Sequence, residues 1–206
     1  GILAAAAAVA MGLAGCTSTQ TDDDSSLLET LREQGSVTVG FAGEAPDSFM
    51  EDGELTGATV ALHREIFSNL GIDTVEGVNA DFGALIPGLQ ANRFDVVSAG
   101  MSILPERCEQ AAFSEPEFNY TTALMVAEGN PMNLSDMQSV LDSGARLATM
   151  TGAIESDYAA ELGIDNTQVA TPQDGMDAVT SGRADVFALT AISLNWMANN
   201  NPDAPV

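Results

Sequence analysis

The hydrophobic positions of this 206-residue chain follow two spacings. Short apolar runs are typical of buried strands, and apolar positions three or four residues apart are typical of helices that bury one face. The predicted strands cover 37–41, 74–78, 94–99, 123–127, 146–150, 168–170 and 186–189. The predicted helices cover 27–34, 59–70, 82–91, 135–141, 155–162, 173–181 and 193–199. Strands that alternate with helices in this way predict an α/β fold with mostly parallel sheets.

A short pattern occurs twice in matching surroundings. Residues 93–96 and 183–186 both read Arg-x-Asp-Val, and each follows a helical segment and opens an apolar strand. This repetition predicts two similarly built lobes, with a break near residues 120–131. We expect the first lobe to cover residues 27–122 and the second to cover residues 123–206.

The N-terminal residues 1–15 are small and apolar and carry no charge. A bilayer core needs about 20 apolar residues, so this run is interpreted as the hydrophobic region of a signal peptide. It ends in Leu-Ala-Gly before Cys16, ahead of a polar run, and this resembles a bacterial lipobox. The resemblance implies that Cys16 is lipidated and that residues 16–26 form a tether. The alternative is a buried alanine-rich helix with a chance cysteine.

The charge of the chain excludes several partners. Asp and Glu number 30 against 6 arginines and no lysine, and the formal net charge is −24. Binding to nucleic acid requires a basic surface that neutralises phosphates, so nucleic acid is not an expected partner. Adhesion to anionic lipid is disfavoured for the same reason. A lysine-free acidic surface is typical of proteins from salt-adapted, halophilic organisms.

Most enzyme motifs are absent from the sequence. His63 is the single histidine, so two-histidine metal motifs are excluded, and we expect its side chain on a solvated helix face. No Gly-x-Ser-x-Gly, Walker loop or Gly-x-Gly-x-x-Gly occurs. Two cysteines are too few for a thiolate zinc site, and Cys108 is expected to be either a small buried side chain or the partner of a cysteine beyond this fragment. The sequence therefore predicts a binding protein with no metal and no cofactor, not an enzyme.

Three loops that follow predicted strands are expected to meet in a cleft between the lobes. Arg107 is the strongest candidate, because a guanidinium binds a carboxylate through two parallel hydrogen bonds. Residues 151–153 precede a helix and are expected to offer free backbone N–H groups to the same anion. Glu44 and Asp47 suit an ammonium or amidinium, and Phe82 suits an apolar wall or a cation–π contact. The alternative is a surface ion pair of Arg107 with a neighbouring glutamate, with Phe82 in the core.

Several motifs occur in a fixed order between residues 37 and 199. They are DGELTG at 52–57, LIPGLQANRFDV at 85–96, PER at 105–107 and FSEP at 113–116. This order resembles the extracytoplasmic solute-binding proteins of polar-amino-acid ABC importers. DFGALIPGL at 81–89 and PERCEQ at 105–110 are most similar to the ectoine/hydroxyectoine-binding branch. The resemblance implies a two-lobe type II periplasmic-binding-protein fold that closes on its ligand, with the C-terminal part of lobe 1 lying beyond this fragment.

The resemblance also implies roles for individual residues. Arg107 corresponds to the arginine that binds the ligand carboxylate, Glu44 to the acidic residue that holds the cationic part, and Phe82 to an aromatic wall. Gly100 and Ser102 correspond to a stretch that gives backbone and hydroxyl contacts.

The sequence departs from the family at three of these positions. The ectoine branch has aromatic residues at the positions of Asp47 and Ser102, and the amino-acid branch has an aspartate at that of Thr190. The expected ligand is therefore a small zwitterion, either an ectoine or a polar amino acid. The residues expected to line its site are Glu44, Asp47, Phe82, Gly100, Ser102, Arg107, Thr151, Ala153, Ile154 and Thr190.

These observations predict a monomeric, lipid-anchored substrate-binding protein, whose partners are an ABC permease and its ATPase. It is expected in the periplasm or on the outer face of the cytoplasmic membrane. A periplasmic dehydratase-like enzyme on the same fold is one alternative, and a ligand-sensing domain is another.

Overall fold

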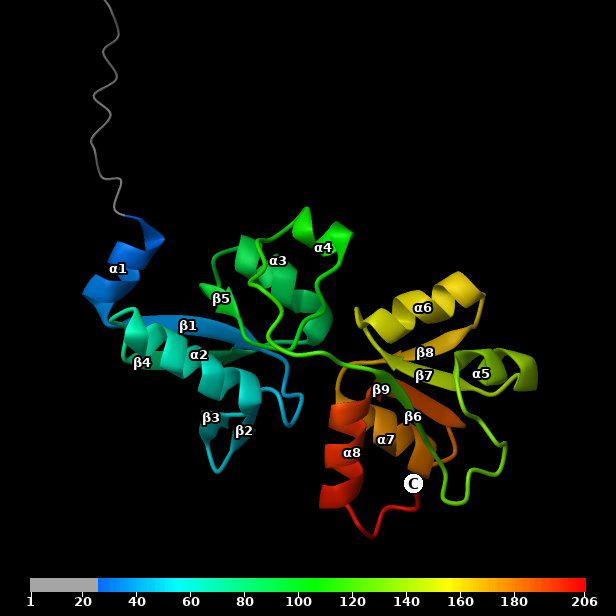
Figure 1. Cartoon of the computed structure of the whole chain (residues 1–206). Helices are drawn as coiled ribbons and strands as arrows, with labels where there is room; N and C mark the ends of the chain where they lie inside the picture. The colour runs from blue at the N-terminus through cyan, green and yellow to red at the C-terminus, as the bar shows by residue number, and fades with distance from the viewer. Residues whose placement is uncertain (1–25) are drawn as a thin grey trace, which may run out of the picture.

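The computed structural model describes residues 26–206, which form two α/β units side by side (Figure 1). The first unit contains a parallel sheet in the order β4-β1-β5. Its strands are β1 (Ser36–Phe41), β4 (Thr74–Asn79) and β5 (Val96–Val97), and a separate hairpin joins β2 (Phe49–Glu51) to β3 (Glu54–Thr56). Its helices are α1 (Leu27–Gln34), α2 (Ala58–Asn69), the 3₁₀ helix η1 (Phe82–Ala84), α3 (Leu85–Gln90) and α4 (Pro105–Cys108). We call this unit the first lobe.

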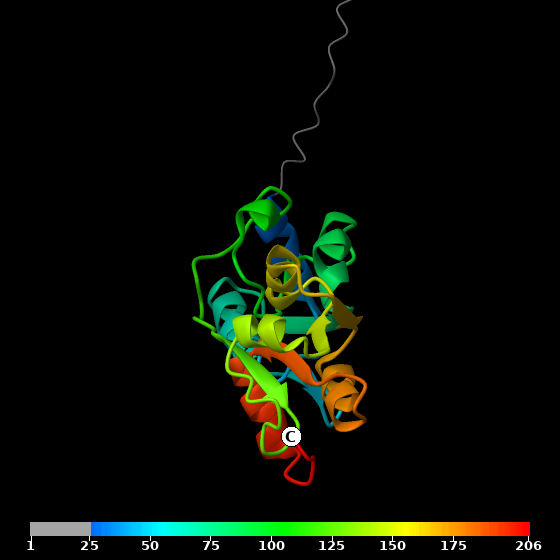
Figure 2. The same cartoon turned by 90° about the vertical axis from the view of Figure 1, so that its right-hand side faces the viewer.

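The second unit, which we call the second lobe, contains a four-stranded sheet in the order β6-β9-β7-β8. Its strands are β6 (Thr122–Val126), β7 (Leu147–Met150), β8 (Asn166–Val169) and β9 (Val186–Thr190), and β6 alone runs antiparallel to its neighbour. Its helices are α5 (Met137–Ser143), α6 (Ile154–Leu162), α7 (Pro172–Thr180) and α8 (Ala191–Asn200). Both views place the C-terminal residues beside the end of α8 (Figure 2).

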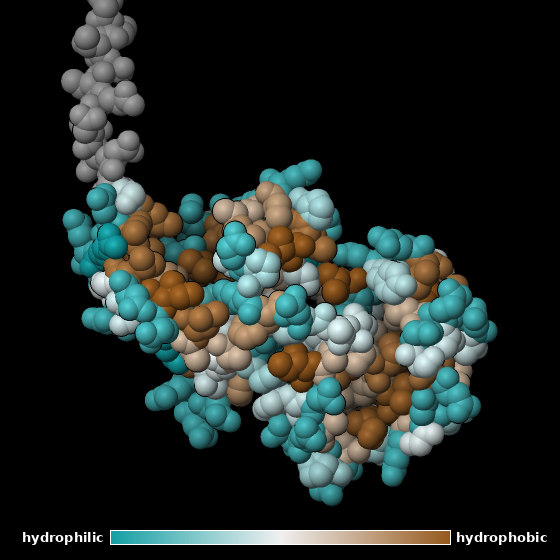
Figure 3. Space-filling view, in the orientation of Figure 1, coloured by the Kyte–Doolittle hydropathy of each residue, from teal (hydrophilic) through white to brown (hydrophobic). Residues whose placement is uncertain are grey.

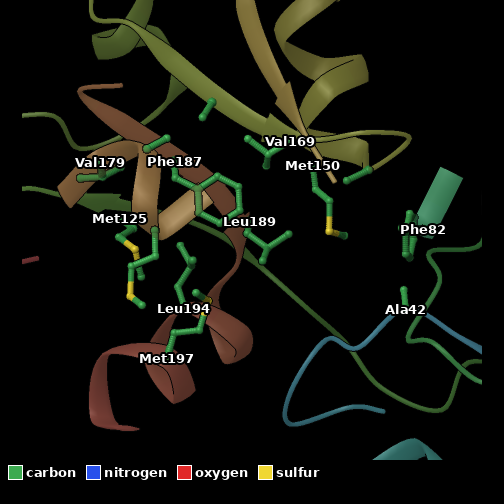
Figure 4. Close-up of a cluster of buried hydrophobic side chains, with 14 of the residues drawn as sticks. Ala42, Phe82, Met125, Met150, Val169, Val179, Phe187, Leu189, Leu194 and Met197 are labelled. Atoms are coloured by element: carbon green, nitrogen blue, oxygen red, sulfur yellow. The ribbon is translucent and has the colours of Figure 1, made fainter. Parts of the chain in front are cut away.

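Strand β9 lies at the centre of the second lobe because both of its faces are apolar. Phe187 and Leu189 belong to the buried cluster that includes side chains of α7 and α8 (Figure 4). Val186 and Ala188 belong to a second cluster, together with side chains of α5 and α6. Successive side chains of a strand point to opposite faces, so this continuous apolar run needs helices on both sides of the sheet.

The two lobes are in direct contact with each other. Phe82 and Ala42 of the first lobe belong to the same buried cluster as Met150 of the second, and Figure 4 shows the three side chains close together. A Cβ atom built on Gly152 would lie 2.9 Å from the Cα of Gly83, so the backbones touch at this point.

The repeated Arg-x-Asp-Val pattern has the same structural role in both lobes. Asp95 precedes β5, and its Oδ2 accepts a hydrogen bond of 2.9 Å from the backbone N–H of Thr38 in β1. Asp185 precedes β9, and its Oδ2 accepts one of 2.8 Å from the backbone N–H of Arg146, which precedes β7. Each aspartate therefore fixes the start of a parallel strand against its neighbour.

The predicted α/β class is confirmed, and α1 has the predicted bounds. The strand predicted at 94–99 has only two residues in the sheet, Val96 and Val97. The helix predicted at 82–91 is divided into η1 and α3, with Pro87 in the first turn of α3, where its missing N–H costs nothing. The β2–β3 hairpin and α4 were not predicted. The lobe boundary at 122/123 stays a prediction.

The expected signal peptide at 1–15, Cys16 and most of the tether at 16–26 lie outside the described residues. Within residues 26–206, no helix is both long and apolar enough to cross a membrane. Hydrophobic side chains gather on the viewed face of both lobes, and hydrophilic ones lie mainly at its edges (Figure 3).

Candidate binding site between the lobes

Arg107, in α4 of the first lobe, is buried at the contact between the lobes, with 7% of its surface exposed. Its Nη1 donates to the carbonyl oxygen of Ser102 at 3.0 Å, and its Nη2 donates to that of Gly152 in the second lobe at 2.9 Å. The guanidinium carbon lies 5.8 Å from the centre of the Phe82 ring, within the range of a cation–π contact. Burial lowers the pKa of Arg107 from its ordinary value. Among the described residues, Arg107 forms no ion pair with a neighbouring glutamate, so the alternative of a surface pair is wrong.

Glu44 follows β1 and is 4% exposed. Its Oε1 accepts hydrogen bonds from two hydroxyl groups of the second lobe, Ser193 Oγ at 2.6 Å and Thr190 Oγ1 at 3.1 Å. Burial raises the pKa of Glu44 to about 7, the Ser193 hydrogen bond opposes this shift, and the nearby Asp47 carboxylate adds to it. Thr190 was predicted to line the site, and its contact with the site is this hydrogen bond to Glu44.

Asp47 lies three residues beyond Glu44 and is 2% exposed. Its Oδ1 accepts a hydrogen bond of 2.9 Å from the hydroxyl group of Tyr120, which precedes β6. Burial raises the pKa of Asp47 above its ordinary value. A Cβ on Gly100 would lie 2.9 Å from Asp47 Oδ2 and 3.0 Å from the Tyr120 hydroxyl, and Gly100 has a φ of 58°. Glycine at position 100 thus allows this pair to form.

Glu155, in the first turn of α6, is a third buried carboxyl group, with 2% of its surface exposed. Its Oε1 accepts a hydrogen bond of 2.8 Å from Thr122 Oγ1. It is close enough to Glu44 and Arg107 to contribute to the pKa shift of each. The positive end of the α6 dipole favours a carboxylate at this position.

The prediction of free backbone N–H groups at Thr151 and Ala153 is wrong. Thr151 N–H donates to Val169 at 2.9 Å, and Ala153 N–H donates to Met150 at 3.1 Å. The first of these bonds lies directly beyond the β7–β8 ladder and the second closes a tight turn, so local backbone bonding uses both donors. The loop contributes the carbonyl oxygen of Gly152 instead, and Ile154 begins α6 with its side chain half-buried.

Two further expectations are wrong. His63 is not solvated but 8% exposed, because its ring is held between two polar side chains: Nδ1 lies 2.9 Å from Ser98 Oγ, and Nε2 lies 2.7 Å from Glu117 Oε1. Cys108 is exposed rather than buried: it ends the one-turn helix α4, whose buried residue is Arg107.

A cavity of about 450 Å³ lies mainly in the first lobe, beside β5 and residues 111–120. Its lining runs from His63 through β5 to Gly100, Tyr120 and Ile154, so one end of the cavity reaches the contact between the lobes. The side chains of Arg107, Glu44, Asp47 and Glu155 do not line this cavity.

The structure thus brings together seven of the predicted residues, Glu44, Asp47, Phe82, Gly100, Ser102, Arg107 and Thr190. Sequence reasoning missed Tyr120, Ser193 and the structural part played by Glu155. Ser193 lies three residues after Thr190, a spacing typical of a helix start, and this was the one local signal available.

Two α/β lobes that meet around a buried arginine, an aromatic ring and buried carboxyl groups define a two-lobed ligand-binding protein. The chain belongs to the bacterial extracellular solute-binding proteins, family 3, whose model matches residues 37–196.

Relatives and solved structures agree with this membership. The probable amino-acid ABC transporter periplasmic-binding protein y4tE of Sinorhizobium fredii is 39% identical over 170 residues, which are 80% of this chain and 56% of that protein. The crystal structure of EhuB in complex with hydroxyectoine superposes with a TM-score of 0.82 at 34% identity, over 87% of this chain and 72% of that one. Holo ArgBP from T. maritima gives a TM-score of 0.78 at 26% identity, over 85% and 77%.

These matches confirm the type II periplasmic-binding-protein fold. The chain spans somewhat more than half the length of y4tE. Most of the similar proteins are named as solute-binding proteins, although the membrane-bound lytic murein transglycosylase F of Maricaulis maris is 28% identical over 87% of this chain and 41% of that enzyme.

Proposed function

We propose that this chain is the ligand-binding part of a substrate-binding protein that delivers a small zwitterion, an amino acid or an ectoine, to an ABC importer. The observation that carries the proposal is the position of Arg107, buried between the lobes with one donor already directed across the contact. Glu44 lies buried in the same contact and supplies the opposite charge. A zwitterion has the two charges that these groups complement.

In this proposal the ligand replaces contacts that the lobes make with each other. Its carboxylate takes the place of the Gly152 carbonyl oxygen at Arg107 Nη2, and its cationic group takes the place of the Ser193 and Thr190 hydroxyls at Glu44. Phe82 forms an apolar wall below the guanidinium. The lobes, which we place at 27–122 and 123–206, close on the ligand.

The cellular setting is also part of the proposal. The family name places such proteins outside the cell membrane, and y4tE is named as part of an ABC transporter. We extend this to a monomer anchored through a lipid on Cys16 that docks on a permease with its ATPase. The same proposal excludes catalysis, since Glu44, Asp47 and Glu155 act as charge partners rather than as acid–base groups.

Calorimetry on the full-length protein tests the proposed function. Ectoine, hydroxyectoine and a set of amino acids are titrated separately, and the ligand is recovered after overnight incubation and identified by mass spectrometry. We expect at least one zwitterion to bind with micromolar or tighter affinity and to be recovered unchanged. Absence of binding by every member of the set contradicts the proposal, and consumption of the ligand favours the enzyme alternative.

A further inference from the structure

The lobes touch each other at a second place, outside the candidate site. The ring of Phe49, in β2 of the first lobe, lies against the ring of Trp196, in α8 of the second lobe. The ring centres are 5.5 Å apart and the ring planes are tilted by 58°, which is a favourable geometry for an aromatic pair. Both side chains are half-buried, so solvent reaches this contact.

The β2–β3 hairpin holds Phe49 in a fixed position. Its turn residues Asp52 and Gly53 have φ values of 51° and 86°, as a tight two-residue hairpin turn requires. Arg64 Nη2, in α2, donates to the carbonyl oxygen of Leu55 in β3 at 2.6 Å and thereby ties the hairpin to the first lobe. Within residues 26–206, Phe49 belongs to none of the buried apolar clusters, so its ring packs outside the core of its own lobe.

Helix α8 joins this ring contact to the candidate site. Ser193 and Trp196 are neighbours on one face of the helix, because residues three positions apart in a helix lie above each other. Ser193 Oγ donates to Glu44 Oε1 at 2.6 Å, while Trp196 contacts Phe49. One face of α8 therefore meets one segment of the first lobe, residues 44–49, through a polar contact inside the site and an aromatic contact beyond it.

We infer that Phe49 and Trp196 form an aromatic latch that holds the lobes together and raises the affinity for every ligand without touching any of them. The inference rests on the proposed function, because it assumes that the lobes close on a ligand. In that function the ligand replaces the Ser193 hydroxyl at Glu44, so α8 gives up its polar contact with the first lobe. The ring contact lies outside the site and is kept, so Phe49 and Trp196 are positioning residues.

The size of the effect follows from the energy of an aromatic pair, which changes an equilibrium constant by roughly three- to tenfold. A ligand that binds only the closed protein has an observed affinity proportional to the closed fraction. Loss of the latch is therefore expected to weaken the binding of all ligands by the same factor, mainly through faster dissociation. Loss of a residue that touches the ligand changes the affinities of different ligands by different factors.

The fluorescence of Trp196 tests whether the latch closes when a ligand binds. Trp196 is the one tryptophan in these 206 residues, and the difference in emission between the unaltered full-length protein and Trp196→Leu gives its signal. The probes are ectoine, hydroxyectoine and the same set of amino acids, added one at a time. A probe that binds is expected to reduce the quenching of this signal by acrylamide, because closure covers the indole ring. This protection is expected to be smaller in Phe49→Leu.

A double-mutant cycle measures the coupling between the two rings. Phe49→Leu and Trp196→Leu are each expected to weaken the binding of every probe that binds by roughly three- to tenfold. The double variant is expected to lose no more than either single variant, because all three lack the same contact. Phe49→Tyr keeps the ring and is expected to retain the affinity.

The matched control is Met50→Ala. Met50 is the next residue of the same strand, so its side chain points to the opposite face, and it is 49% exposed. This variant is expected to keep both the affinity and the protection of Trp196 from acrylamide.

The outcomes separate this inference from the proposed function. Unchanged affinity and unchanged protection of Trp196 in Phe49→Leu overturn the latch and leave the proposed function intact. Losses that differ between probes also overturn it, because they indicate direct contact with the ligand, and so do losses that add up in the double variant. Failure of every probe to bind the unaltered protein overturns the proposed function and the inference together.

Discussion

In both lobes an aspartate that precedes a parallel strand accepts a hydrogen bond from the backbone of the neighbouring strand, Asp95 beside β1 and Asp185 beside β7. In both lobes a helical glycine lies against a phenylalanine ring. A Cβ on Gly88 would lie 2.6 Å from Phe94, and one on Gly175 would lie 2.4 Å from Phe187. The lobes thus share a plan at the level of single contacts.

The lobes differ in what they contribute to the site. The first lobe provides Arg107, Glu44, Asp47 and Phe82. The second lobe makes hydrogen bonds to Arg107 and Glu44 with uncharged groups, a carbonyl oxygen and two hydroxyls, while its buried Glu155 bonds to Thr122 of its own lobe. We interpret the first lobe as the part that selects the charges of the ligand and the second as the part that closes over it. A shared plan therefore does not imply a shared role.

The largest expected effect is that of Arg107→Ala on binding. Removal of a buried partner of a charged group costs about 2–5 kcal/mol or more, which corresponds to an affinity loss of roughly 30-fold to several thousand-fold. Calorimetry with the best ligand measures this loss. Arg146→Ala in the second lobe is the control, because Arg146 is exposed and pairs with Asp185, and it is expected to leave the affinity unchanged. Similar affinity losses in both variants would contradict the division of roles.

Gly175→Ala and Gly88→Ala compare the packing of the two lobes. Each new methyl group meets a phenylalanine ring, so each variant is expected to lose about 1–3 kcal/mol of unfolding free energy. The loss is expected to be larger for Gly175, because Phe187 is completely buried and Phe94 is 3% exposed. Urea denaturation measures both values. If Gly175→Ala raised the free energy of unfolding, the close contact between Gly175 and the Phe187 ring would be contradicted.

Asp95→Ala and Asp185→Ala compare the two strand contacts. Loss of Asp95 leaves the Thr38 N–H in a half-buried position without its acceptor, at an expected cost of about 1–3 kcal/mol. Asp185 pairs with the exposed Arg146, so its loss is expected to cost less than about 1 kcal/mol. The reverse order in thermal or urea unfolding would contradict the comparison.

The contribution of Asp185 is expected to depend on pH. Its pKa is lowered by hydrogen bonds from the Arg146 side chain and backbone. A carboxyl group with a lowered pKa stabilises the fold above its unfolded pKa, and this stabilisation is lost as the pH falls through the folded value. The stability difference between the unaltered protein and Asp185→Ala is therefore expected to vanish in acid.

Glu44 gives a pH effect of the opposite sign. Its pKa rises from 4.5 to about 7 in the folded protein, so its contribution to stability is present below pH 4.5 and decreases as the pH rises through 7. Relative to Glu44→Gln, the unaltered protein is expected to lose roughly 2–3 kcal/mol of unfolding free energy between pH 5 and pH 8. If the stability of the two proteins changed in parallel with pH, folding would not raise the pKa of Glu44, and the prediction would be wrong.

The smallest expected effect is that of Ser193→Ala. The Ser193 hydroxyl favours the ionised form of Glu44, so its removal is expected to move the Glu44 titration to higher pH. Measured at pH 7, the affinity for a cationic ligand is expected to fall a fewfold, and at pH 9 the difference is expected to disappear. Asn195→Ala, on the exposed side of the same helix, is the control.

The sequence predicts most of the fold because its signals are local. The apolar run of β9 and the glycine after α1 act over a few residues, and the Arg-x-Asp-Val repeat marks equivalent positions. The antiparallel direction of β6 was not predictable, because strand direction depends on the path of the chain between sheets.

The candidate site was predictable only in part. Arg107 and Glu44 could be found because each follows a strand and carries a charge. The Glu44–Ser193 contact joins residues 149 positions apart, and no local pattern specifies such a pairing. His63 was misplaced for a related reason, since its partners Ser98 and Glu117 lie 35 and 54 positions away.

The contact between Gly83 and Gly152 has a practical consequence. The backbones touch there without side chains, so even a methyl group at position 152 would act as a wedge between the lobes. Gly152 also has a φ of 76°, which strains any replacement. Adjusting how closely the two lobes approach each other, and with it the response of an engineered biosensor, is therefore more practical from the side of Gly83, where a Cβ would be 3.4 Å from Thr151.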